Sequence, residues 1–197
     1  MLADHLDIAT NSSVLSHLSD KTRAGLLSRS RVMHYSRGAT IFIEGDRAST
    51  MKVVLRGWVK LYRITAGGNE VIVQLLPTGR SFEEFASLYC APYSISAQAV
   101  SDCTLLHVDV NSGQAQGDVQ SEITMAVLLA TSNHMDDLLC EVEQLKAQNG
   151  AQRLTEFLLK LCQNADGACE VELPYEKIVI AGRLGMKPES LSRAIGR

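Results

Sequence analysis

The spacing of hydrophobic residues changes along this chain, and each change predicts a different kind of element. Between Asn11 and Ser28 leucines recur at helical intervals, which predicts a short N-terminal helical segment. Residues 31–110 instead form short runs of β-branched and apolar residues separated by turn formers. Because no helix is predicted between these runs, we expect an antiparallel β-roll. The predicted strands are Thr40–Ile43, Met51–Leu55, Trp58–Ile64, Val71–Leu76, Ser96–Val100 and Thr104–Val108.

A long helix is predicted from about Val119 to Gln148, where glycine and proline are absent. Apolar positions recur there at alternating intervals of three and four, the spacing of a seam between two helices. A helix packed on its own β-roll would also carry such residues. We favour a homodimer, because about 30 helical residues span about 45 Å, more than a small roll covers. The six positions, named here the apolar stripe, are Leu128, Thr131, Met135, Leu138, Val142 and Leu145.

Two short helices joined by a tight turn are predicted over residues 175–197. Gly185 ends the first helix and Pro188 begins the second. We expect Leu191 and Ile195 to face the core, with polar residues on the opposite side. This pattern is typical of a DNA-binding helix-turn-helix, although an ordinary helical hairpin with a charged face is the alternative. The outward residues are Glu189, Ser190, Ser192, Arg193 and Arg197.

Composition and charge support a globular protein with a basic C-terminal end. The 197 residues are 46% hydrophobic and 21% charged, and the formal net charge is −3. The last fifteen residues, however, contain one acidic side chain, Glu189, among several basic ones. This local excess of positive charge favours a nucleic-acid partner. The basic residues are Arg183, Lys187, Arg193 and Arg197.

Several other classes of protein are disfavoured. The sequence has no His-x-His pair, glycine-rich phosphate loop or G-x-S-x-G elbow, so we expect no enzyme. Five cysteines without a C-x-x-C pair argue against a zinc ribbon or a disulfide framework, and we expect them to be reduced. No run is long enough to cross a bilayer, and the N-terminus lacks a signal-like pattern. We therefore expect a cytoplasmic protein that does not contact membranes.

Six motifs are spread along the chain: Gly38…Phe42…Glu44-Gly45, Leu55-x-Gly57-x-Val59-x-Leu61, Gly79-x-x-Phe82-x-Glu84, Ala97-x-Ala99, Arg153-Leu154 and Ala181-x-x-Leu184-Gly185-Met186-x-Pro188-Glu189-Ser190-Leu191-Ser192-Arg193. These motifs resemble those of the CRP/FNR superfamily of bacterial transcription regulators. The resemblance implies an α+β fold: an N-terminal antiparallel jelly roll like a cyclic nucleotide-binding domain, a long dimerisation helix and a C-terminal winged helix-turn-helix. It divides the chain into an effector-sensing roll (1–118), a dimerisation helix (119–149) and a DNA-binding domain (150–197).

Within that superfamily, two sensing mechanisms do not match. Members that bind cyclic AMP hold its phosphate with an Arg-Ser pair, whereas the matching stretch Pro92–Ala97 contains no arginine. The helix positions that meet adenine in those members fall on Leu138 and Leu139. Oxygen sensors hold an iron-sulfur cluster on N-terminal cysteines, and the first cysteine here is Cys90. Neither cyclic AMP nor an iron-sulfur cluster is therefore expected.

The chain is most similar to the DNR/NNR branch, which responds to nitric oxide and other nitrogen oxides. The matching segments are Phe82–Ala86 and Tyr93–Ala99. The resemblance implies allosteric control by a nitrogen-oxide or redox signal, with haem as a possible cofactor. The candidate haem ligands are His134, His107, His34, His17 and Cys90. The candidate effector-binding residues are Phe82, Glu83, Glu84, Ser94, Ser96, His134 and Leu138.

The second predicted helix carries Glu189, Ser192 and Arg193 at the positions that read DNA in the fumarate-nitrate type. This match implies a TTGAT-like half-site in double-stranded DNA, and membership of such a family implies RNA polymerase as a further partner. A sensor or adaptor module without DNA binding is the alternative. Family members continue into a β-hairpin wing, whereas this chain stops at Arg197, so we expect weakened DNA binding. The expected phosphate contacts are Lys187, Ser190 and Arg197.

Overall fold

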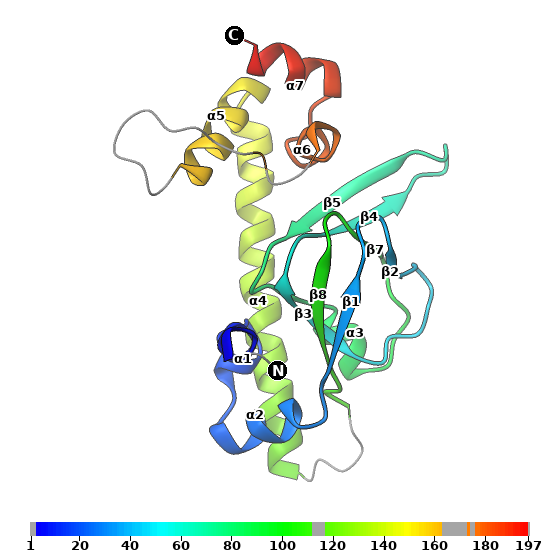
Figure 1. Cartoon of the computed structure of the whole chain (residues 1–197), viewed down its shortest axis with the longest axis vertical. Helices are drawn as coiled ribbons and strands as arrows, with labels where there is room; N and C mark the ends of the chain where they lie inside the picture. Colours follow the sequence, from blue (N-terminus) through cyan, green and yellow to red (C-terminus); the bar gives the residue numbers. More distant parts are fainter. Residues whose placement is uncertain (1–2, 112–116, 163–172, 174–175, 197) are drawn as a thin grey trace. The chain divides into compact units, whose positions relative to one another are not determined.

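The computed structural model describes residues 3–111, 117–162, 173 and 176–196 (Figure 1). The chain divides into two compact units, Met1–Met135 and Asp136–Arg197. Helix α4 (Gly117–Ala147) contributes residues to both units, and its length agrees with the predicted long helix. The predicted functional division at residues 118 and 149 stays a prediction.

Three short helical pieces begin the first unit; two of them lie within the predicted helical segment Asn11–Ser28, and the first precedes that segment and was not predicted. They are α1 (Ala3–Thr10), the 3₁₀ turn η1 (Leu15–His17) and α2 (Asp20–Leu27). The Glu122 carboxylate of α4 accepts hydrogen bonds from the Ser19 amide and the Thr22 hydroxyl at the start of α2. These bonds satisfy N-terminal donors of α2 and tie it to α4.

Two four-stranded antiparallel sheets form the roll, as predicted. One sheet has the order β1-β8-β3-β6 and the other β2-β7-β4-β5. Strands β1 and β6 and the helix α3 (Glu84–Leu88) were not predicted, because β1 is exposed along most of its length and the other two are very short. The strands are β1 (Arg31–Tyr35), β2 (Thr40–Phe42), β3 (Met51–Arg56), β4 (Val59–Ile64), β5 (Glu70–Leu76), β6 (Ser81–Phe82), β7 (Ser96–Ala99) and β8 (Cys103–Val108).

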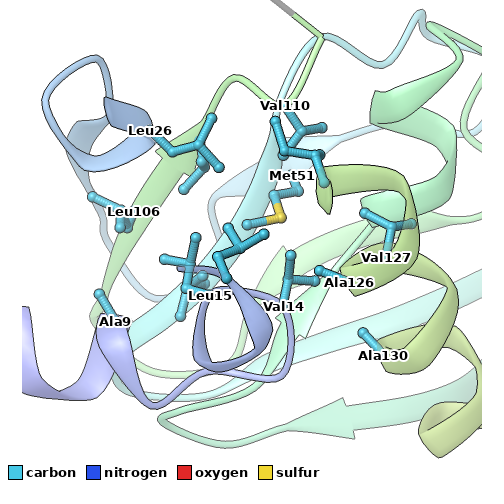
Figure 2. Close-up of a cluster of buried hydrophobic side chains, with 14 of the residues drawn as sticks. Ala9, Val14, Leu15, Leu26, Met51, Leu106, Val110, Ala126, Val127 and Ala130 are labelled. Carbon is cyan, nitrogen blue, oxygen red and sulfur yellow. The ribbon is translucent and has the colours of Figure 1, made fainter. Parts of the chain in front are cut away.

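Strand β3 separates two apolar clusters because its residues Met51–Leu55 are buried on both faces. One face, with Met51 and Val53, packs against the N-terminal helices and α4. Figure 2 shows side chains from these helices gathered around Met51. The other face, with Val54, points into the roll, where Phe42, Phe82 and Tyr93 lie. A polar residue on this inner face is consequently enclosed by apolar side chains.

The second unit is built from α5 (Gly150–Leu161), α6 (Lys177–Arg183) and α7 (Pro188–Ile195). Asn149, where a break was predicted, caps α5 through its side chain, which accepts from the amides of Ala151 and Gln152. The Arg153 guanidinium donates to the Leu184 carbonyl (2.8 Å) and the Gln148 carbonyl (2.5 Å). Arg153 thereby joins the ends of α4 and α6.

Two expectations for the C-terminal residues are wrong. Ile195 is 40% exposed instead of facing the core, whereas Leu191 is fully buried as expected. Cys162 is disulfide-bonded, while Cys90, Cys103 and Cys140 are free. The number and spacing of the cysteines argue against several disulfide bonds, but a single disulfide bond requires no particular spacing in the sequence. None of the helices in the described ranges is both long and apolar enough to cross a membrane.

Candidate effector site and candidate DNA-reading helix

Helix α7 presents the predicted DNA-reading residues on one exposed face. Proline at its first position, Pro188, fixes the start without losing an intrahelical hydrogen bond. Ser192 and Arg193 come three and four residues after Glu189, so the three side chains lie on one side of the helix. All three are exposed. Leu191 anchors the opposite side in the core. The helix therefore offers a carboxylate, a hydroxyl and a guanidinium to a partner.

The turn before α7 depends on small residues. Gly185 has a φ of +59°, and a Cβ there would lie 3.1 Å from Leu145 Cδ2. The Met186 amide donates to the Ala181 carbonyl at 2.9 Å, which closes the turn over the end of α6. Ala181 is fully buried. These contacts explain why the motif requires alanine and glycine here.

The Arg193 side chain of α7 makes long hydrogen bonds to two residues of its own helix. Arg193 donates from Nε to the Glu189 carbonyl and from Nη2 to Ser190 Oγ, each at 3.4 Å. These distances are long for hydrogen bonds to a guanidinium. Lys187 is exposed and Ser190 is half-buried. The remaining predicted contact, Arg197, lies outside the described residues.

The predicted effector residues of β6 and α3 are adjacent and largely buried. Phe82 is 2% exposed and Glu84 is 5% exposed. Glu83 caps α3 with a left-handed backbone, φ 62° and ψ 29°, an uncommon conformation for a residue other than glycine. Among the described residues, Glu84 Oε1 has no hydrogen-bond partner although it is buried. Such an atom has lost its solvation without compensation and marks a place for water or a ligand.

The two predicted serines of this site differ in position. Ser96 is buried, and its hydroxyl accepts from the Glu44 amide at 3.0 Å, so it holds the loop after β2. Ser94 is exposed, and its carbonyl accepts from Arg63 Nε at 3.0 Å and Nη2 at 2.8 Å. The structure therefore does not bring Ser94 into the roll interior with Phe82 and Glu84.

Sequence reasoning missed a buried lysine in the roll. Lys52 of β3 is 3% exposed, and its ammonium donates to the Thr50 carbonyl at 2.8 Å and to the Tyr93 hydroxyl. It also lies 4.9 Å from the Phe42 ring centroid and 4.7 Å from that of Tyr93. Burial lowers the pKa of Lys52 to about 8, although the Glu83 carboxylate opposes this shift. A lysine within the apolar run Met51–Leu55 was the available signal.

The pKa values of Glu83 and Tyr93 are both raised. Burial raises the pKa of Glu83 to about 7, with Lys52 opposing and Glu84 reinforcing this shift. Burial, followed by the nearby Glu83 charge, raises the pKa of Tyr93 to about 12. Tyr93 stacks on Phe42 with ring centroids 3.8 Å apart, and Phe42 also contacts Phe82 at 6.2 Å. This part of the roll thus combines aromatic walls with a few ionisable groups.

The candidate haem ligands are not equivalent. Both ring nitrogens of His107 are engaged, Nδ1 with Thr50 Oγ1 at 3.2 Å and Nε2 with Tyr35 Oη at 3.1 Å. Burial, followed by the Lys52 charge, lowers the pKa of His107 to about 4. His34 Nδ1 contacts Thr104 Oγ1.

The remaining candidates differ in exposure. His17 is exposed, and Cys90 Sγ accepts from Asn111. His134 Nε2, by contrast, is buried without a hydrogen-bond partner in the described part of the chain. Of the candidate haem ligands, His134 is therefore the one whose buried ring nitrogen is left for a ligand role. Separately, the described residues contain no cluster of three or more His, Cys, Asp or Glu side chains suited to a metal ion.

The apolar stripe of α4 is exposed in the single chain. Leu128, Met135 and Val142 are 52%, 59% and 44% exposed. Leu138, predicted to contact both the effector and a partner helix, is 40% exposed and belongs to the second unit. Thr131 is exposed as well, and its hydroxyl donates to the Val127 carbonyl. Leu145, 49% exposed, completes the stripe.

Two family models match the chain. A model of the cyclic nucleotide-binding domain matches residues 32–114, which comprise most of the roll. A model of the Crp-like helix-turn-helix domain matches residues 152–197, which include α5, α6 and α7.

Proteins similar over most of the chain include one curated relative and two crystal structures. The cyclic AMP receptor protein of Thermus thermophilus is 30% identical over 163 residues, 82% of this chain and 73% of that protein. A candidate cyclic nucleotide binding protein from Ruegeria pomeroyi has 44% identity and a TM-score of 0.72, covering 98% of this chain and 86% of its own. DNR from Pseudomonas aeruginosa has 28% identity and a TM-score of 0.55, with coverages of 98% and 86%.

Proposed function

Because the chain belongs to the CRP/FNR family of DNA-binding transcription regulators with an effector-binding domain, we propose that it acts as a homodimer whose DNA affinity is controlled by a small effector in the roll. Its relatives are transcriptional regulators, which are not enzymes. The exposed polar face of α7, anchored by buried Leu191, carries the proposal. A mobility-shift assay with family operator DNA tests it.

The proposed half-site resembles TTGAT. Arg193 would donate to guanine N7 and O6, Glu189 would accept from the cytosine amine of the opposite strand, and Ser192 would lie near a thymine. Pro188 occupies the position where the cyclic AMP type carries an additional arginine, and a proline has no donor to offer a guanine. Lys187, Ser190 and Arg197 would bind phosphates and fix the orientation of the helix.

A comparison of two basic residues tests this assignment. Arg193→Ala should weaken binding to the TTGAT half-site by about 1–3 kcal/mol and relax the preference at the guanine. Lys177→Ala removes an exposed charge of the same sign from the start of α6 and should leave the base preference unchanged. Equal loss of specificity in both variants would contradict a base-reading role for Arg193.

Dimerisation is proposed through the apolar stripe. Members of the family typically dimerise, and a row of half-exposed leucine, methionine and valine side chains on one helix is unusual for a surface that stays in water. In a two-fold dimer the apolar stripe of one protomer would pack against the same stripe of its partner. The symmetry would place two inverted half-sites about one helical turn apart on the DNA.

The proposed effector is a nitrogen-oxide or redox signal instead of cyclic AMP. No arginine lies in Pro92–Ala97. The Arg63 guanidinium, which donates to the Ser94 carbonyl of this stretch, is exposed. Glu84 and His134 each offer a buried polar atom with no partner in the described residues. Calorimetry should detect no micromolar cyclic AMP binding, because such affinity is worth about 8 kcal/mol and needs a paired phosphate.

Haem is the cofactor to test within this proposal. His134 would supply the protein ligand, since its Nε2 is buried and free while the ring nitrogens of His107 are engaged. Bound haem would supply an iron centre that binds diatomic gases. A Soret band in the haem-incubated protein that His134→Ala abolishes would support this role. A band unchanged in that variant would exclude His134.

A sensor or adaptor without DNA binding is the competing function. It predicts that the chain retains effector binding but gives no shifted complex with any duplex. The basic C-terminal end and the exposed face of α7 favour the DNA-binding function. RNA polymerase is the further partner proposed for a regulator of this type, and the cytoplasm is its proposed location.

A further inference from the structure

The interior of the roll contains a positive charge, that of Lys52, which has no direct ionic partner among the residues that the structure describes. The Lys52 ammonium is enclosed by Phe42 and Tyr93 and donates to neutral oxygens, the Thr50 carbonyl and the Tyr93 hydroxyl. The carboxylate that interacts with it, Glu83, influences its pKa but forms no ion pair or hydrogen bond with it. A buried ammonium compensated only at a distance retains part of its desolvation cost.

Glu83 is suited to move away from this charge. It is half-buried at the N-terminus of α3, so its carboxylate has a route to the surface. Its left-handed backbone is a sparsely populated, strained conformation for a residue with a side chain, and a change of conformation would release that strain. Its side chain makes no hydrogen bond that caps α3. Little local structure is therefore lost when the carboxylate leaves.

We propose that the Lys52 ammonium and the Tyr93 hydroxyl form a binding site for a small planar oxyanion or carboxylate, which takes the place of the Glu83 carboxylate. The inference rests on the proposed function only in treating the roll as the sensing part of the chain. Two oxygens on one small anion match the two donors, an ammonium and a phenol. Phe42, which stacks on Tyr93 and lies 6.2 Å from Phe82 between ring centroids, surrounds the two donors with aromatic side chains, so the proposed ligand is an anion of few atoms.

The charges around the site make this binding depend on pH. A bound anion needs Lys52 protonated, which holds below about pH 8, and is repelled less when Glu83 is protonated, which holds below about pH 7. Affinity should therefore decrease severalfold from pH 6 to pH 8, because the protonated fractions of Lys52 and Glu83 both decrease over this range. Other titratable groups whose charges act on Lys52, Glu83 or Tyr93 are Glu84, His107, Tyr35 and Asp46.

Calorimetric titration of the whole chain with sodium formate and with sodium nitrite, at constant ionic strength, tests the site. We expect saturable binding at pH 6 that is severalfold weaker at pH 8. Tighter binding of formate would assign the site to carboxylates, and tighter binding of nitrite would assign it to inorganic oxyanions; either supports the proposal. Absence of saturable binding of both at pH 6 would overturn it.

Four variants separate the site from nonspecific effects. Lys52→Met should abolish binding, and Tyr93→Phe, which keeps the stack on Phe42, should weaken it at least fivefold. Lys60→Met is the control, since Lys60 lies over the Tyr62 ring and pairs with Glu70, and it should bind normally. Glu83→Gln should show a smaller decrease of affinity between pH 6 and 8 than the unsubstituted chain, because one of the two titrating groups is gone and only the deprotonation of Lys52 remains.

The outcomes distinguish this proposal from the proposed function. Unchanged binding in both Lys52→Met and Tyr93→Phe, or a Glu83→Gln variant with the full pH dependence of the unsubstituted chain, would overturn the anion site. Thermal unfolding of each variant verifies that it is folded, and Tyr93→Phe decides the question if Lys52→Met is not. Because no DNA enters the titration, loss of the anion site leaves DNA binding to be measured separately.

Discussion

The glycine between β3 and β4 gives a sharp prediction about stability. Gly57 has a φ of +88°, and a Cβ there would lie 2.4 Å from the Asp102 carbonyl oxygen and 2.8 Å from Ser101 Oγ. The 2.4 Å contact is to backbone and cannot be relieved by turning a side chain. Gly57→Ala must therefore push the β3–β4 turn away from the connection between β7 and β8.

The expected cost has two parts. An alanine forced into a left-handed backbone loses about 1–2 kcal/mol. The displacement also weakens two hydrogen bonds, from the Trp58 amide to Ser101 Oγ (3.1 Å) and from the Val100 amide to the Trp58 carbonyl (2.8 Å). Each contributes about 1 kcal/mol. We expect Gly57→Ala to lower the unfolding free energy of the first unit by about 3–4 kcal/mol.

Urea unfolding followed by far-ultraviolet circular dichroism and by fluorescence of Trp58, the single tryptophan, measures this change. Gly25→Ala is the matched control, because Gly25 lies within α2 with no atom within 4 Å of the added Cβ. That variant should gain about 0.5–1 kcal/mol from helix propensity. A loss below about 1 kcal/mol for Gly57→Ala, or equal effects at the two glycines, would refute the reasoning from close approach.

Three further changes test the dimer interface, the raised pKa of Glu83 in the roll and the turn before α7. Leu138→Glu should give a monomer in sedimentation, since two charges would meet at the two-fold contact. Cys140→Glu, on another face of α4, should leave the dimer intact. A Leu138→Glu variant that remains dimeric would exclude the apolar stripe as the dimer interface. Because the folded chain raises the Glu83 pKa from 4.5 to about 7, it binds more protons than the unfolded chain in that range, so the unfolding free energy should decrease as pH rises from about 4.5 to 7. Glu83→Gln should flatten this decrease in pH-dependent denaturation, and an unchanged slope would contradict the shift. Gly185→Ala should destabilise the second unit by about 1–2 kcal/mol in thermal unfolding and weaken operator binding, and a neutral effect on both would contradict the need for its positive φ.

The architecture was predictable from the sequence where periodicity is strong. Strands such as Met51–Leu55 and the long helix α4 have enough residues for their spacing to be read, and the Gly185 and Pro188 signals mark the ends of α6 and α7. Helix α3, with five residues, is too short for its period to be distinguished from a turn. The spacing between Leu191 and Ile195 places both on one side of α7, but it does not show whether another element covers that side along its whole length. Ile195 is exposed in the structure.

The candidate effector site was only partly predictable. Phe82, Glu83 and Glu84 are consecutive, so locating one locates the others. Lys52 was missed because its importance depends on which face of β3 points into the roll, and a strand buried on both faces gives no alternation that reveals this. Ser94 was included because of its place in a motif, but its side chain is exposed. Side-chain direction and cross-strand neighbours come from the fold, not from spacing.

Selection of bound sequences from a pool of random duplexes tests the central claim most directly. At low ionic strength, where phosphate contacts contribute most, the chain should enrich two inverted TTGAT-like half-sites about one helical turn apart. Arg193→Ala should still bind but lose the preference for the guanine, as expected if its guanidinium reads that base. Enrichment of TGTGA half-sites would show that Pro188 does not distinguish the two types of operator. Failure to enrich any sequence would contradict the assignment of α7 as a DNA-reading helix.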